Sequence, residues 1–178
     1  SDIDLLFLTD VKPDADHVQV IEFILYLLWD LGLDIGHASR SLRQAFHAAK
    51  DDLTIRTALL EARHLAGLSS LSDKLLGQFH EDIVADTAKS FIASKLEERD
   101  ARHRRSDARR YMLEPNIKEG KGGLRDLHTL FWISRYGFAV DTVFELVNRK
   151  VLTHSEARSF SNAQRFLWTV RCHMHFRS

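Results

Sequence analysis

The sequence predicts an α+β protein, with a small mixed α/β part followed by an all-α part. Residues 3–9, Ile-Asp-Leu-Leu-Phe-Leu-Thr, read as a buried strand. Residues 17–31 then repeat apolar side chains every three or four positions, as an amphipathic helix does. After Gly67 the strand-like runs stop and helical periods continue almost to the C-terminus. This order of elements favours a small sheet followed by a helical layer.

The composition excludes several classes of protein. The 178 residues carry 25 Lys and Arg and 25 Asp and Glu, so the formal net charge of zero argues against a protein that coats nucleic acid. Cys172 is the single cysteine, which excludes an internal disulfide and fits a reducing compartment. The longest strongly apolar run, residues 23–29, is too short to span a bilayer. We therefore expect a cytoplasmic protein with neither membrane nor nucleic acid as a partner.

The first third of the chain reads as a βαβ-like unit with a mixed sheet. Residues 33–39 alternate as a half-polar strand does, and residues 63–66 are a third candidate strand that ends at Gly67. Helices are expected over residues 41–49 and 52–61, the second with Asp52 as its N-cap.

The remainder reads as helices around one irregular stretch, residues 111–123. The expected helices cover residues 71–85, 87–105, 124–136, 140–149 and 155–176. We place the domains at residues 1–75 and 76–178. The chain starts Ser-Asp-Ile-Asp, with neither Met nor a lead-in, and stops within a helix. We therefore expect both domains to be truncated.

Two aspartates share one face of the first predicted strand. Asp2 and Asp4 stand two positions apart, so strand geometry turns both carboxylates to the same side, while Ile3 and Leu5 face the core. Asp34 is an isolated acid in the second predicted strand. Mg²⁺ prefers such carboxylate oxygens together with substrate phosphates, and three carboxylates suit an in-line displacement at phosphorus. Asp-x-Asp alone is short and common, so solvated acids at a strand end are the competing interpretation.

The irregular stretch contains a loop rich in glycine and lysine. Gly120, Gly122 and Gly123 fall within four positions, and Lys118, Lys121 and Arg125 add three cations. The loop leads into a helix at about residue 124, whose first amides favour an anion. These features suit a phosphate-bearing ligand, although the Gly-Lys-Ser/Thr ending of a Walker A loop is missing. A tight turn between helices with solvated lysines is the alternative.

This loop resembles a known signature. Glu-Pro-Asn-Ile-Lys at residues 114–118 and Gly-Gly-Leu-Arg-Asp-Leu-His-Thr at residues 122–129 resemble the bifunctional uridylyltransferase/uridylyl-removing enzymes that modify the nitrogen regulatory protein PII. The opening Ser-Asp-Ile-Asp-Leu-Leu is similar to the nucleotidyltransferase motif of that family. The glutamine synthetase adenylyltransferases have a similar layout, but the loop fits them less well.

The resemblance implies a polymerase-β-like nucleotidyltransferase sheet, N-terminally truncated, followed by an all-α helical domain. It implies that Asp2, Asp4 and Asp34 bind Mg²⁺ and that a PII tyrosine attacks the α-phosphate of UTP and releases pyrophosphate. Asp34 is then a candidate base for that tyrosine. From the loop chemistry we infer that Lys118, Lys121 and Arg125 contact phosphates, and we add Gly122 and Gly123 of the same loop to the nucleotide site. Ser1, at the nucleotidyltransferase-like opening, is assigned to the nucleotide site as well.

Two departures from the family pattern limit the expectation. The family's glycine-rich segment before Ser1 is missing, so we expect the fragment alone to be nearly inactive. The His-Asp dipeptide of the family's uridylyl-removing hydrolase domain is also missing from this chain.

Other interpretations stay open. A non-catalytic nucleotide-binding regulatory module, or an adenylyltransferase, would carry the same fold. His37, beside Asp34, is expected either to orient substrate or to cap the strand. The charged run at residues 95–110 is expected to be a solvated, salt-bridged helix, with a docking surface for PII or UTP as the alternative.

Overall fold

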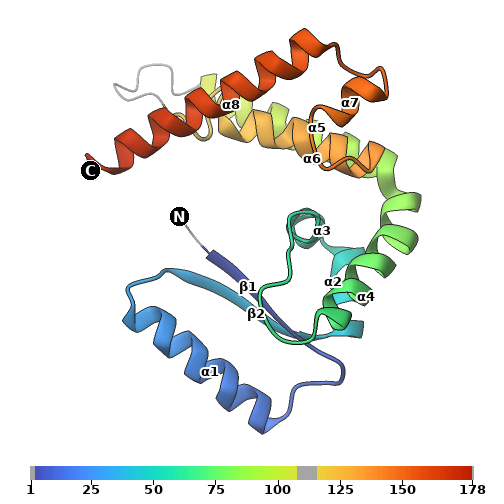
Figure 1. The fold of residues 1–178 in the computed structure, drawn as a ribbon, viewed down its shortest axis with the longest axis vertical. Coiled ribbons are helices and arrows are strands. Elements are labelled where there is room, and N and C mark those ends of the chain that lie inside the picture. Colours follow the sequence, from blue (N-terminus) through green and yellow to red (C-terminus); the bar gives the residue numbers. More distant parts are fainter. Residues whose placement is uncertain (1–2, 108–115, 178) are drawn as a thin grey trace. The chain divides into compact units, whose positions relative to one another are not determined.

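The structure, a computed structural model, describes residues 3–107 and 116–177 and is mostly helical, with one small parallel sheet (Figure 1). The chain divides by packing between Ala85 and Asp86 into two compact units. The mixed α/β character and the order of a sheet followed by helices are as predicted. The domain boundary after residue 75 stays a prediction, because packing units and domains are different divisions.

The first unit is built on two parallel strands, β1 (Ile3–Thr9) and β2 (Ile35–Ser41), joined by helix α1 (Ala15–Asp30). In the register of these two strands, Ile3 lies opposite Ile35 and Thr9 lies opposite Ser41. The core between sheet and helix contains Ile21, Leu25 and Ile35, with Leu5, Phe7 and Leu28 packed against it. Leu5 and Phe7 therefore face α1, as predicted for Leu5. The expectation of a buried strand is wrong, because no residue of β1 is buried and Ile3, expected in the core, is 40% exposed. The expected mixed sheet is wrong for the described residues, whose two strands are parallel.

Side-chain caps fix the next two helices. Ser41 begins α2 (Leu42–Asp51) with a capping box, in which its hydroxyl accepts from the Gln44 N–H and Gln44 accepts from the Ser41 N–H. Asp52 caps α3 (Leu53–Leu60) by accepting from the Thr54 N–H at 2.6 Å, which confirms the predicted N-cap.

The third predicted strand is wrong. Residues 63–66 have neither strand geometry nor burial, and Leu65 is 65% exposed. Gly67 follows with φ +88°, and helix α4 (Ser69–Gln78) begins directly after it. Four residues without an apolar partner surface do not stabilise a strand.

The helices predicted over residues 71–85 and 87–105 follow one another without a break in helical secondary structure. Helix α4 passes through a π-helical turn, η1 (Phe79–Val84), into α5 (Ala85–Asp107). Phe79 and Ile83 in this turn are buried, and the turn contacts α2. The wider π turn thus keeps apolar side chains in the core of the first unit.

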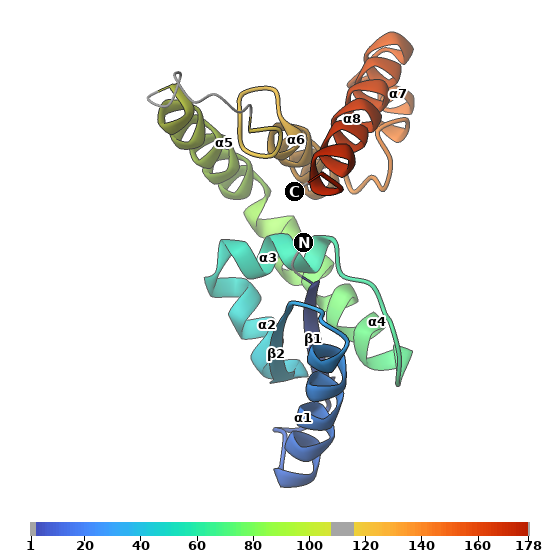
Figure 2. The same cartoon turned by 90° about the vertical axis from the view of Figure 1, so that its left-hand side faces the viewer.

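The second unit packs α5 against α6 (Leu124–Phe138), with α7 (Glu145–Asn148) and α8 (His154–His175) beside them (Figure 2). The rings of Phe91 on α5 and Tyr136 on α6 stack with centroids 3.8 Å apart. The helix predicted over residues 140–149 shortens to α7, because Ala139 adopts a left-handed conformation that ends α6 and turns follow it. No helix in the part of the chain that the structure describes is long and apolar enough to cross a membrane.

Candidate functional site

The first group of predicted residues lies where β1 and β2 begin. The Ile3 N–H donates to the main-chain carbonyl of Asp34 at 3.2 Å, so the pairing of the strands extends to Asp34. Asp4 is in register with Gly36, two residues after Asp34. Since residues two apart along extended backbone share a face, this pairing is compatible with Asp4 and Asp34 facing one side of the sheet.

The absence of a side chain at Gly36 makes room for the Asp4 carboxylate. A Cβ added at Gly36 would collide with Asp4 Oδ1. Asp4 and Asp34 are both exposed, and neither carboxylate has a hydrogen bond or ion pair with another of the described residues. Both therefore have oxygens open to a ligand, which is the donor chemistry that Mg²⁺ requires.

Asp2, the third predicted carboxylate, lies outside the described residues, because it precedes residue 3. The same is true of Ser1, which was predicted to contact the nucleotide. Within residues 3–107 and 116–177, no group of three or more His, Cys, Asp or Glu residues is arranged to hold a metal ion. The three-carboxylate site thus stays a prediction, with two of its members on paired backbone segments.

His37 lies away from the Asp4 carboxylate. It is in register with Leu5, on the side of the sheet that α1 covers, and its ring meets the Trp29 ring edge-on at 6.2 Å between centroids. Neighbouring residues on a strand point to opposite faces, so the arrangement places His37 against the helix and not beside Asp4.

The glycine-rich loop, residues 116–123, is folded on itself. Asn116 Oδ1 accepts from the Lys118 and Glu119 N–H groups, and the Gly120 N–H donates to the Asn116 carbonyl. Gly122 has φ +72°, and a Cβ at Gly123 would collide with the carbonyl of Ile117. Glycine is therefore required here for a tight turn.

The amides that were expected to bind an anion are used inside the loop. The N–H groups of Leu124 and Arg125 donate to the carbonyls of Ile117 and Lys118, and the Gly123 N–H donates to Gly120. A phosphate at this helix start would have to displace those bonds. Any phosphate contact in the observed conformation must come from side chains, and Lys118 and Lys121 are exposed.

Arg125 is engaged within the unit. Its Nε lies 3.3 Å from Glu119 Oε1, and its guanidinium sits over the Trp132 ring at 5.6 Å from the centroid. Arg125 thus has partners within the protein.

Asp126, which was not among the residues predicted from the sequence, joins the loop to α5. Asp126 Oδ1 accepts from Arg102 Nη2 at 2.5 Å, and Oδ2 lies 2.7 Å from His103 Nε2. Oδ2 also accepts from the Gly122 N–H at 2.9 Å. Burial raises the pKa of Asp126, but hydrogen bonds from Arg102, Gly122 and His103 outweigh it, so the pKa lies below its ordinary value.

The described part of the charged run, residues 95–107, is not the fully solvated helix that was expected; residues 108–110 lie outside the described residues. Lys95 and Arg102 are only 5% and 6% exposed and belong to the contact between α5 and α6. Lys95 Nζ pairs with Glu98 at 2.9 Å and lies over the Trp132 ring. Arg99 and Asp100 do form an exposed pair. Charge alone did not reveal that one face of this helix packs inward.

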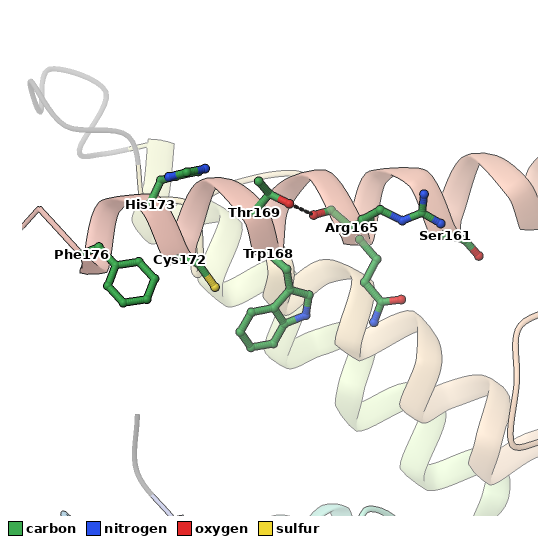
Figure 3. A pocket seen from close by; sticks show the side chains of 8 residues that line it. Ser161, Arg165, Trp168, Thr169, Cys172, His173 and Phe176 are labelled. Carbon is green, nitrogen blue, oxygen red and sulfur yellow. Dashed lines mark hydrogen bonds between the residues drawn. The ribbon is translucent and has the colours of Figure 1, made fainter.

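A shallow hollow runs along α8 (Figure 3). Side chains of that single helix line it, among them Trp168, Cys172 and Phe176. It contains none of the predicted site residues, and its lining offers no carboxylate for a metal.

The comparisons with known proteins agree with the loop signature. The family model described as GlnD PII-uridylyltransferase matches residues 90–178, half of the chain, including the loop, Asp126 and helices α6 to α8. No solved structure matches the chain significantly.

Proposed function

Because the chain belongs to the PII-uridylyltransferase family, we propose that it carries the transferase module that moves UMP from UTP to a tyrosine of PII. The match to the family over residues 90–178 is the observation that carries this proposal. The match supports an enzyme domain of nucleotidyltransferase type, with UTP and PII as partners. The single cysteine is compatible with a cytoplasmic setting, and the zero net charge with partners other than nucleic acid.

We assign the chemistry to the strand starts of the first unit and its fold to the polymerase-β-like class. Two parallel strands, with exposed Asp4 and Asp34 at their starts, support the assignment. In the proposed reaction the tyrosine oxygen forms a bond to the α-phosphorus of UTP, and the bond from that phosphorus to the bridging oxygen breaks. Pyrophosphate leaves, and Asp34 accepts the phenolic proton.

Asp4 and Asp34, with Asp2, would hold Mg²⁺, which when bound offsets the negative charge of the triphosphate. The Asp4 carboxylate lies against Gly36, in space that a side chain there would fill, and Asp4 is exposed, which supports this role. On the loop, the exposed Lys118 and Lys121 would contact phosphates, and Arg125 would contribute by holding the loop through Glu119. Ser1, Gly122 and Gly123 complete the proposed nucleotide contacts; the N–H groups of the two glycines would have to exchange their bonds to Asp126 and Gly120 for bonds to phosphate.

Asparagine substitutions in the full-length protein test this assignment. Asp4→Asn and Asp34→Asn should each lower UMP transfer to PII by about 100-fold or more, because each removes a charged group at the reacting phosphate. Asp30→Asn is the matched control, since Asp30 is an exposed acid at the end of α1. Titration of Mn²⁺ into the protein measures metal binding independently of turnover. Both site variants should bind Mn²⁺ more weakly than wild type.

Wild-type rates for Asp34→Asn would reject its assigned role. UTP binding without transfer, by a protein that is otherwise folded, would favour the non-catalytic nucleotide-binding module. Labelling from ATP in place of UTP would favour an adenylyltransferase.

A further inference from the structure

One edge of β1 offers main-chain groups to a further strand. The Ile3 N–H donates to the Asp34 carbonyl, and along a strand the N–H and C=O groups of successive residues point to alternate edges. Asp4, Leu6 and Leu8 therefore direct their main-chain groups away from β2. Within residues 3–107 and 116–177 the sheet consists of β1 and β2, so no third strand there uses these groups.

A hollow of about 430 Å³ follows that edge. Residues 6–9 of β1 all line it, although neighbouring residues of a strand face opposite sides of the sheet. A hollow that touches four strand residues in a row lies along an edge of the strand. It is the edge away from β2, because β2 contributes none of the described residues that line it. His17 and Val20 of α1 and Ala66, which precedes α4, belong to its walls.

We propose that this hollow, the β1-edge groove, binds the tyrosine-bearing segment of the protein substrate in extended form, as a strand added to β1. The inference rests on the proposed function, which supplies a protein substrate that is modified on a tyrosine. It goes further by naming the surface that receives this protein and the main-chain groups that hold it.

The chemistry of the edge selects a peptide as the ligand. Leu6 and Leu8 each offer one N–H donor and one C=O acceptor, about 7 Å apart along the strand. An extended peptide repeats the same groups at the same spacing, which is how partner strands bind at open sheet edges. Residues 6–9 span about 10 Å, so the groove pairs with about three or four residues of the partner. Val20, at 59% exposure, leaves apolar wall surface for the side chains of that segment.

The groove lies on the same strand as a proposed catalytic carboxylate. Asp4 precedes Leu6 by two residues, about 7 Å along β1, and their side chains share one face of the strand. Leu6 is 39% exposed, so it offers an aromatic ring an apolar surface next to Asp4. A segment that pairs with Leu6 and Leu8 therefore carries a tyrosine about two residues further on to the strand start, where Asp4 and Asp34 lie.

Ala66→Trp in the full-length protein tests the groove by filling it. Ala66 is exposed and lies outside helices and strands, so a larger side chain there is compatible with the fold. We expect KM for PII to rise about tenfold while KM for UTP stays unchanged, because the variant obstructs the protein substrate and not the nucleotide. Ala62→Trp is the matched control. Ala62 is exposed in the same segment between α3 and α4 and does not line the groove, so both KM values should stay at wild type.

Hydrogen exchange resolved to single amides measures the pairing itself. The full-length protein is compared with and without saturating PII, in the presence of a UTP analogue whose α,β-bridging oxygen is replaced by a methylene group. This analogue cannot release pyrophosphate, so the complex does not turn over. The Leu6 and Leu8 N–H groups should exchange at least about tenfold more slowly when PII is bound. The N–H groups of Leu5 and Phe7, which face β2, should be unaffected.

Several outcomes would overturn the proposal. An unchanged KM for PII in Ala66→Trp does so, as does an equal rise in Ala62→Trp or in KM for UTP. Unchanged exchange of the Leu6 and Leu8 amides in protein saturated with PII also does so. Each of these failures occurs in an enzyme that transfers UMP and leaves the proposed function in place. A wild-type protein that transfers no UMP to PII instead refutes the proposed function, and this inference with it.

Discussion

Removal of the Arg102 guanidinium should destabilise the second unit strongly. In Arg102→Met the apolar stem of the side chain is kept, but Asp126 loses its shortest partner while it remains 17% exposed. Breaking a buried ion pair costs about 3–5 kcal/mol when the other charge is left alone. Asp126 keeps the His103 and Gly122 contacts, so we expect a loss of about 2–3 kcal/mol.

Urea unfolding at pH 7 measures this loss as a lower midpoint with an unchanged slope. The double variant Arg102→Met/Asp126→Asn should be less unstable than the sum of the single variants by about 1–2 kcal/mol, because it leaves neither charge stranded. A loss below about 0.5 kcal/mol for Arg102→Met would refute the reasoning, since that is the range of an ordinary surface substitution.

The pairing of Arg102 with Asp126 also predicts how the free energy of unfolding depends on pH. The pKa of Asp126 is lowered in the folded protein, so its contribution to stability is complete above the unfolded pKa of about 3.9 and is lost as pH falls through the folded pKa. The stability difference between wild type and Arg102→Met should therefore be constant from pH 7 to about pH 5 and shrink below pH 4. A difference that grows on acidification would contradict the assigned pairing.

Three further substitutions test separate parts of the fold. Phe91→Ala should lower the free energy of unfolding by about 3–5 kcal/mol in urea, because Phe91 is fully buried against Tyr136; a loss under about 1 kcal/mol would contradict this packing. Ser41→Ala should cost about 1 kcal/mol by thermal unfolding through loss of the capping box, whereas an unchanged midpoint would exclude that cap. Gly36→Ala should displace the Asp4 carboxylate and weaken Mn²⁺ binding, with a change in stability below about 1 kcal/mol; unaltered metal binding would argue against Asp4 as a ligand.

Elements with strong local signals could be predicted from the sequence. The apolar period of α1, the apolar residues of β1 and the cap at Asp52 all correspond to observed structure, because each depends on residues a few positions apart. The strand expected at residues 63–66 did not form, since nothing local indicates whether a partner surface is available to Leu65. The helix expected at residues 140–149 is observed only as the short α7, because bends and turns occupy residues 141–144 after the left-handed residue Ala139.

The candidate site also contains residues that could be predicted from the sequence and residues that could not. Asp4 and Asp34 were predictable as isolated acids on strand-like segments, and the paired backbones bring those segments together. The Asp126 junction was not predictable, because Arg102 precedes Asp126 by 24 positions and an irregular stretch separates them. Only an Arg-His pair on one helix, followed by an acid in the first turn of the next, hinted at it, and such a pattern is common.

The junction also changes the interpretation of the glycine-rich loop. Glycines and cations in one short segment suggested backbone amides wrapped around phosphate, yet those amides bond within the protein. The glycines permit the tight turn, and the side chains of Lys118 and Lys121 are exposed on the loop.

Transfer of label from UTP to purified PII tests the central claim most directly. The full-length protein, supplied with Mg²⁺, PII and UTP labelled at the α-phosphate, should attach one UMP to a PII tyrosine for each pyrophosphate released. The Asp34→Asn variant should do so at about a hundredth of that rate or less. Absence of label on PII from a folded protein that binds UTP, or labelling from ATP in preference to UTP, would contradict the account.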